Sequence, residues 1–228
     1  MLLGKVSSFK SKMSIESDRD NLFNLLDNHK SAQPKKDATE FARKLDGKYA
    51  HQKQFIRSLP ASRHVELVKD DIATSLIPED LPLQPDAEVA KTTGNGDCLY
   101  NAVSLALVGE ETQASLLHLL VALELLLHTD YYIHHPRHTS FSSAADHHHP
   151  DKLFSVCLTT NSDRVFHDTN QGREEAVWSE ARIASKSYKW SGFLYIAALS
   201  SVLTKPIFSV YPNCNTGIHD FMHCEVSP

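Results

Sequence analysis

A glycine-rich stretch that runs directly into a cysteine is the part of this sequence best suited to chemistry. Gly94 and Gly96 stand on either side of Asn95, and Asp97 then leads to Cys98, where an apolar helical pattern begins at once. Glycines permit close backbone approach, and the first turn of a helix presents unpaired N–H groups that favour an anion. A thiol there is expected to ionise readily and act as a nucleophile, with an oxyanion held by the surrounding backbone N–H groups.

The helix that begins at Cys98 has a signal at each end. Asp97 is placed to cap its N-terminus, and Gly109 is placed to end it. Between them, small and apolar residues recur at helical spacing, so one face of this helix is predicted to be buried. The alternative interpretation of Cys98 is that it is only a small buried hydrophobic residue at the head of an apolar helix.

The run from Gly94 to Ser104, Gly-Asn-Gly-Asp-Cys-Leu-Tyr-Asn-Ala-Val-Ser, resembles the nucleophile motif of the ovarian tumour (OTU) family of cysteine proteases. The family motif reads Asp-Gly-Asn/Asp-Cys-Leu-Phe/Tyr. The sequence is most similar to the OTU-like domains related to vertnin, whose Cys-Leu-Tyr-x-Ala-Val-Ser-Leu-Ala-Leu run is matched from Cys98 to Leu107. The family usually has an Asp three places before its cysteine, where this sequence has Asn95.

A second block in the C-terminal half resembles the same family. OTU domains typically carry Trp-Gly, a helix rich in alanine and leucine, and then a Pro-Ile-x-x-Tyr strand. Here Trp190 and Gly192 precede a predicted helix from Phe193 to Leu203 and a predicted strand from Pro206 to Tyr211, although Ser191 splits the Trp-Gly pair. These residues would also serve as core in an unrelated domain, but both blocks occur in the family's order.

The resemblance implies an α+β, papain-like OTU fold, with a small central sheet flanked by helices. It also implies a cysteine isopeptidase, or deubiquitinase, that acts on ubiquitin or a ubiquitin-like protein and needs no cofactor. Cys98 would be the nucleophile, and the backbone N–H groups of Gly96, Asp97 and Cys98 would hold the oxyanion. Asn95 is neutral where the family has an acid, so its amide could itself donate to the oxyanion.

Such a protease also needs a histidine that exchanges protons with the thiol and the leaving amine. In the family this histidine follows further strands and precedes an aromatic residue. After Tyr211 only His219 and His223 remain, and His219 is the better candidate because Asp220 adjoins it. Two alternatives stay open: the catalytic histidine lies beyond Pro228 in a longer protein, or the chain is a non-catalytic module that binds ubiquitin or another protein.

The chain is predicted to divide into a helical N-terminal region with a linker, residues 1–85, and the OTU-like domain, residues 86–228. Helical patterns begin near Ser14 and near Ala38, and a further short helix is expected from Ala61 to Ala73. Three prolines between residues 78 and 85 mark the linker. The N-terminal region either packs on the OTU-like domain or presents a partner surface, and a helical adaptor is a third functional hypothesis.

Two further helices are expected inside the OTU-like domain. The segment from Glu110 to about His128 is apolar nearly all round, interrupted by His118 and Glu124, which is typical of a helix buried in the middle of a domain. The segment from Arg173 to Lys186 is predicted to be the other helix. Leu153 to Thr160 is expected to form either a short strand or a helix.

Histidines crowd the segment between these two helices. Metal binding is one hypothesis for this cluster. We favour an exposed, irregular loop with no metal site, because the prolines and serines of the segment fix no ligand geometry. The histidines concerned are His134, His135, His138, His147, His148 and His149.

Composition sets broader limits on function. The chain has 228 residues, 41% of them hydrophobic, and a formal net charge of −5, which gives no reason to expect nucleic acid as a partner. The four cysteines show no paired short spacing, so no zinc site or disulfide framework is expected. Met1–Val6 is too short for a signal peptide, and the longest apolar run, Leu116 to Leu127, is shorter than a membrane span. We therefore expect an intracellular protein, of cytoplasm or nucleus, with no membrane partner.

Overall fold

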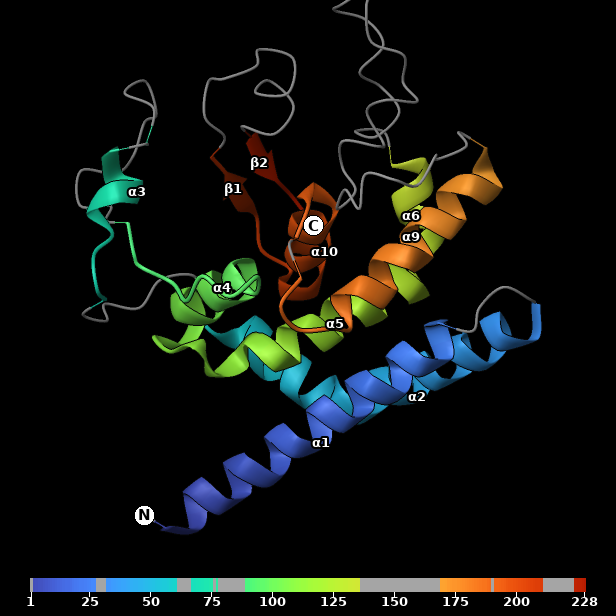
Figure 1. The fold of residues 1–228 in the computed structure, drawn as a ribbon, viewed down its shortest axis with the longest axis horizontal. Helices are drawn as coiled ribbons and strands as arrows, with labels where there is room; N and C mark the ends of the chain where they lie inside the picture. The colour runs from blue at the N-terminus through green and yellow to red at the C-terminus, as the bar shows by residue number, and fades with distance from the viewer. Residues whose placement is uncertain are drawn as a thin grey trace, which may run out of the picture.

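The computed structural model describes residues 2–27, 32–60, 67–75, 77, 89–135, 169–189, 191–210 and 224–228, and Figure 1 shows its fold. Helices dominate this part of the chain, and two short strands pair antiparallel with Ile207 opposite Val226. The class is therefore α+β. The helices are α1 (Leu2–Asp27), α2 (Ala32–Ser58), α3 (Asp71–Ser75), α4 (Cys98–Val108), η1 (Glu111–Gln113), α5 (Ala114–Leu127), α6 (Thr129–His134), α9 (Asn170–Ala184) and α10 (Phe193–Leu203), and the strands are β1 (Ile207–Ser209) and β2 (Cys224–Val226).

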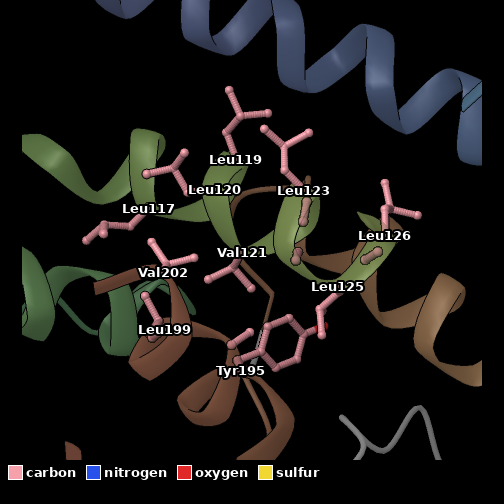
Figure 2. Packing of buried hydrophobic residues seen from close by; sticks show 14 of the residues in the cluster. Leu117, Leu119, Leu120, Val121, Leu123, Leu125, Leu126, Tyr195, Leu199 and Val202 are labelled. Atoms are coloured by element: carbon pink, nitrogen blue, oxygen red, sulfur yellow. The ribbon is translucent and has the colours of Figure 1, made fainter. Parts of the chain in front are cut away.

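Helix α5 lies in the middle of the described structure, as its all-round apolar sequence predicts. Every residue from Leu116 to Leu126 is buried, and the helix contacts α1, α2, α4, α9 and α10. In Figure 2, Val121 and Leu125 point toward Tyr195 of α10, whereas Leu119 and Leu123 point the opposite way, toward the blue N-terminal helices. Burying one such leucine side chain contributes about 1.5–3 kcal/mol, so this helix supplies much of the stability of the fold.

The two long N-terminal helices form an antiparallel pair along one side of α5 (Figure 1). Their apolar residues belong to the same core as those of α5, α9 and α10. Arg57 of α2 also donates to the carbonyl oxygen of Val202 at 2.8 Å, which joins α2 to the end of α10. The described side chains of α1 and α2 therefore pack against the rest of the described structure. The predicted boundary at residues 85 and 86 lies outside the described residues.

The helices that lead to the cysteine and to the strands agree with the sequence patterns. Helix α4 begins at Cys98 and ends before Gly109, whose φ of 78° is the left-handed conformation that glycine adopts at helix ends. Helix α10 spans Phe193–Leu203, as predicted. Helix α9 starts before the predicted Arg173, because the Thr169 hydroxyl accepts from the Gly172 N–H and caps the helix there.

Two N-terminal expectations are corrected. Helix α1 begins at Leu2 rather than near Ser14, so Ser14 lies inside the helix and does not cap it. The Ser14 hydroxyl instead accepts from Lys48 of α2 at 3.1 Å. Within the predicted helix from 61 to 73, the described residues before Asp71 are not helical. Lys69 instead forms an antiparallel bridge with Ala90, since these segments satisfy their backbone groups by pairing with each other. The predicted element at 153–160 lies outside the described residues.

The two-stranded sheet packs against α10, with Val226 buried beside Phe193 and Phe208 exposed on the other face. Within the described part, the middle of the fold is thus occupied by α5 and not by the sheet. Among the helices described, none combines the length and the apolar character needed to cross a membrane.

Candidate active site at the start of α4

Cys98 is the first residue of α4, and its side chain is half-buried. The first backbone bond of this helix runs from the Asn101 N–H to the Asp97 carbonyl at 2.9 Å. The preceding N–H groups, those of Cys98, Leu99 and Tyr100, have no acceptor among the described residues. The helix dipole places partial positive charge at the same end, so the backbone around the thiol is suited to an anion.

The Asp97 side chain does not cap α4, contrary to the prediction from sequence. Its Oδ1 atom accepts a hydrogen bond from the Nε2 atom of His118 in α5 at 3.0 Å, and a second from the backbone N–H of Tyr188. The carboxylate is therefore drawn away from the helix start and toward two distant segments. This leaves the N–H groups of the first turn of α4 without an acceptor among the residues that the structure describes.

Asn95 stabilises the turn before the cysteine. Its side-chain oxygen accepts from the Asp97 N–H at 3.1 Å and from the Nδ2 atom of the buried Asn101 at 3.4 Å. Asn101 also donates to the Thr93 carbonyl at 3.2 Å. The Asp97 N–H is thus already paired with Asn95, so of the three predicted oxyanion donors the N–H groups of Gly96 and Cys98 remain as candidates.

Gly96 is required by two features of this turn. Its φ is +92°, and a Cβ atom there would lie 2.7 Å from the carbonyl carbon of Tyr188. Tyr188 also has a positive φ of 62°, which is unusual for a residue with a side chain. The backbone of Tyr188 therefore packs directly onto the loop before Cys98, residues 93–97, while its side chain remains exposed.

His118 is the functional-site residue that the sequence pattern did not identify. It is 1% exposed, its Nδ1 atom lies 2.9 Å from the Ala184 carbonyl oxygen, and its ring stacks on Tyr100 with centroids 3.6 Å apart. The available signal was a histidine in a helix that is apolar nearly all round apart from His118 and Glu124, because a buried imidazole needs polar partners.

The charges of Asp97 and His118 depend on each other. Burial of the Asp97 carboxyl acts to raise its pKa, but the hydrogen bonds from His118 and Tyr188 outweigh burial and hold the pKa below its usual value. Burial lowers the pKa of His118, and the hydrogen bond to Asp97 acts against it. Because both ring nitrogens of His118 face acceptor oxygens, the ring satisfies both only when it is doubly protonated.

The described residues bring no imidazole to the sulfur of Cys98. His118 is the histidine nearest to the loop by its contacts, but both of its nitrogens are occupied by Asp97 and Ala184. His219 and His223 lie in residues 211–223, outside the described part of the chain. The described site therefore presents a thiol and backbone donors, and the assignments of Cys98 as the nucleophile and His219 as the base stay predictions.

The histidine cluster is only partly within the described residues. His134 ends α6 and has its Nδ1 atom 2.9 Å from the Asp130 carbonyl oxygen, and His135 lies against Tyr131. His138, His147, His148 and His149 fall outside the described residues. No group of side chains suited to a metal ion is found in the part of the chain that is described.

Comparison with known proteins identifies the domain that contains Cys98. The family model described as "Vertnin, OTU domain" matches residues 89–228. Vertnin of Homo sapiens is 26% identical over 160 residues, which cover 70% of this chain and 21% of that protein. Vertnin of Mus musculus is also 26% identical over 160 residues, covering 70% of this chain and 20% of that protein. The match spans about a fifth of these relatives, and no solved structure matches. Since the family model covers more than half of the sequence, the chain belongs to the family of vertnin OTU domains.

Proposed function

We propose that this chain is a thiol-dependent isopeptidase of OTU type that acts on ubiquitin or a ubiquitin-like protein inside the cell, in the cytoplasm or nucleus. The observation that supports an enzyme is the position of Cys98, a half-buried thiol at the first residue of α4 among unpaired N–H groups. The papain-like arrangement and the substrate class are proposed by analogy with other OTU proteases, and the match of residues 89–228 to a vertnin OTU domain supports that analogy.

In the proposed reaction, the Cys98 thiolate attacks the carbonyl carbon at the C-terminus of the ubiquitin tail. The carbonyl oxygen becomes an oxyanion, which the N–H of Cys98 and its neighbours stabilise. The C–N bond then breaks, the leaving amine takes up a proton, and a thioester remains on Cys98. Water hydrolyses this thioester, which restores the thiol and releases the tail as a carboxylate.

The proton steps require a general acid and base, for which His219 is the candidate in this sequence. Attack by the thiolate depends mainly on the helix start, whereas departure of the amine depends on protonation. We therefore expect that the chain forms a covalent adduct with ubiquitin more readily than it turns over ubiquitin chains.

The second candidate is a non-catalytic module that retains the OTU scaffold and binds ubiquitin or another protein. The observation in its favour is that no described residue donates to, or accepts from, the Cys98 sulfur. Binding without turnover would use the same surface around α4. The two functions therefore differ in whether Cys98 reacts with the bound protein, and not in where that protein binds.

The test uses ubiquitin that carries an electrophilic group at its C-terminus. We expect an adduct that peptide mapping assigns to Cys98, that Cys98→Ala abolishes and that the control Cys224→Ala retains. Ubiquitin dimers should be cleaved slowly. Rapid cleavage that is lost in His219→Ala would show a complete triad, whereas ubiquitin binding without any adduct would favour the second candidate. Absence of both adduct and binding would refute both functions.

A further inference from the structure

Arg19 of α1 contacts the segment that packs on the loop before Cys98, residues 93–97, which we call the nucleophile loop because Cys98 is the proposed nucleophile. It is only 3% exposed, although it carries a positive charge. Its Nε atom donates to the Ser185 carbonyl at 3.2 Å, and its Nη2 atom donates to the Ser187 hydroxyl at 3.1 Å. A buried guanidinium is costly unless its donors are used, so these two contacts specify where the segment lies.

Two further residues on the same face of α1 contact the same region. Phe23 follows Arg19 by one helical turn, and the Lys186 Nζ atom lies 3.6 Å from the centre of its ring. Asp27 follows by another turn and accepts from Arg182 of α9 at 2.8 Å. Helix α1 thus holds the last turn of α9 and the residues that follow it at three successive positions.

The held segment leads directly to Cys98. Ser185 and Ser187 are followed by Tyr188, whose N–H binds the Asp97 carboxylate and whose backbone packs on Gly96. Asp97 immediately precedes Cys98. The two hydrogen bonds from Arg19 and the two contacts of Tyr188 therefore connect α1 to the residues immediately before α4.

Charge reinforces this connection. Arg19 and Asp97 are close enough to attract each other, and Glu16 and Asp20 also act on Arg19 from its own helix. The guanidinium offsets the negative charge of Asp97 beside the thiol. Without it, Asp97 would be less well compensated, and its side chain could turn toward the unpaired N–H groups of α4, where it would compete with a thiolate.

We propose that Arg19 is a positioning residue for the nucleophile loop, so that α1, which lies outside the matched OTU-domain region, is part of the catalytic unit. The inference rests on the proposed function insofar as Cys98 is the nucleophile. It assigns a role to the N-terminal helices beyond core packing. They prevent the Asp97 carboxylate from binding the N–H groups of the first turn of α4, which a Cys98 thiolate would use.

The test compares Arg19→Met, which keeps an apolar stem and removes the donors, with Arg19→Lys, which keeps the charge. Limited trypsin digestion reports the segment directly, because Lys186 and Lys189 are exposed within it. We expect the rate of cleavage at these two lysines to rise about tenfold in Arg19→Met, because local opening of the segment becomes easier.

The second measurement is alkylation of Cys98 by iodoacetamide at neutral pH. Its rate should fall about threefold or more in Arg19→Met, and both changes should be smaller in Arg19→Lys.

The matched control is Arg57→Met. Arg57 is likewise an arginine of the N-terminal pair that donates to carbonyl groups of the C-terminal half, but its partners are Ser201 and Val202 at the end of α10. The Arg57→Met variant should have a lower melting temperature than the wild type, but the rates of Cys98 alkylation and of trypsin cleavage at Lys186 and Lys189 should be unchanged.

The outcomes separate this inference from the proposed function. Unchanged trypsin cleavage and alkylation in Arg19→Met would overturn the role of Arg19, even if the wild-type protein reacts with the ubiquitin probe. Equal effects of Arg19→Met and Arg57→Met would also overturn it, by showing general destabilisation only. If the ubiquitin probe fails but Arg19→Met selectively opens the 185–189 segment, the positioning role holds and the isopeptidase proposal fails. If Arg19→Met does not fold, Arg19→Lys against Arg57→Lys decides by the same two measurements.

Discussion

The carboxylate of Asp97 and the ring of His118 lie 3.0 Å apart, although one residue opens α4 and the other lies inside α5. This bond fixes the direction of the Asp97 side chain, and with it the environment of the adjacent Cys98. The stack of His118 on Tyr100 ties the ring to the same helix start from the other side. The loop before Cys98 is therefore anchored on α5, in which every residue from Leu116 to Leu126 is buried.

The first prediction is a pH-dependent loss of stability from Asp97→Asn. The hydrogen bonds that outweigh burial hold the pKa of Asp97 below its unfolded value. Its stabilising contribution is therefore complete above about pH 4 and is lost as the pH falls through the lower folded pKa. Thermal melts should show Asp97→Asn clearly less stable than wild type at about pH 5, with the difference vanishing near about pH 2.

The control for this prediction is Asp46→Asn, which removes a carboxylate from the half-exposed pair with Lys53 on α2. It should change the melting temperature little at either pH. A difference between Asp97→Asn and wild type that grows toward acidic pH would contradict the assignment of Asp97 as the ionised partner.

The second prediction compares two glycines of one loop. Gly96→Ala forces a side chain into a φ of +92° and against the backbone of Tyr188, whereas Gly94 has no atom within 4 Å of an added Cβ. We expect Gly96→Ala to lower the free energy of unfolding by about 1–3 kcal/mol and Gly94→Ala to change it by about 0.5 kcal/mol or less. Chemical denaturation of both variants checks this, and equal losses would mean that the loop conformation differs from the one described.

Local patterns explain why much of the fold was predictable from sequence. Helix α10 was predicted residue by residue because its apolar run starts after Gly192 and stops before Thr204 and Lys205. The buried position of α5 follows from leucines on every side. Each of these signals lies within one element, where spacing and end residues carry the information.

The contacts of the site depend on residues far apart in the chain. Nothing in the spacing around Asp97 indicates that it binds His118 and Tyr188 rather than capping its own helix. Nothing in α1 indicates that Arg19 reaches Ser185. Such pairs depend on how the helices pack against one another, and the spacing of residues within one segment carries no information about that packing. The position of Cys98 at a helix start was predictable because its motif is contiguous, whereas the groups that hold its loop were not.

The third prediction is selective reactivity of Cys98. Cys98 and Cys224 are both half-buried, but only Cys98 stands at a helix start with unpaired N–H groups. Brief treatment of the folded protein with iodoacetamide, followed by peptide mass mapping, should label Cys98 before Cys224, Cys157 or Cys214. Faster labelling of another cysteine in the folded state would remove the main support for a nucleophile at α4.

The fourth prediction concerns the histidine cluster, which we expect to be dispensable. Replacement of His147, His148 and His149 by alanine together should leave both the melting temperature and the reaction with the ubiquitin probe nearly unchanged. The measurement is made with and without added zinc. A large loss of either property that zinc restores in the wild type alone would establish a structural metal site instead.

The last prediction concerns Asn95→Asp, which introduces an aspartate three places before Cys98, where the OTU family usually has one. Asn95→Asp keeps an oxygen that can accept from the Asp97 N–H, so the turn before Cys98 should be preserved. The new carboxylate adds a second negative charge to a loop that already holds Asp97, and like charges near the thiol disfavour its ionised form. Alkylation of Cys98 at neutral pH should therefore slow by about two- to fivefold, corresponding to roughly 0.5–1 kcal/mol. Asn95→Ser, which offers a neutral acceptor, should leave the rate close to that of the wild type. Faster alkylation in Asn95→Asp than in both wild type and Asn95→Ser would mean that an acid at this position activates the cysteine, and that asparagine lowers the reactivity of this chain.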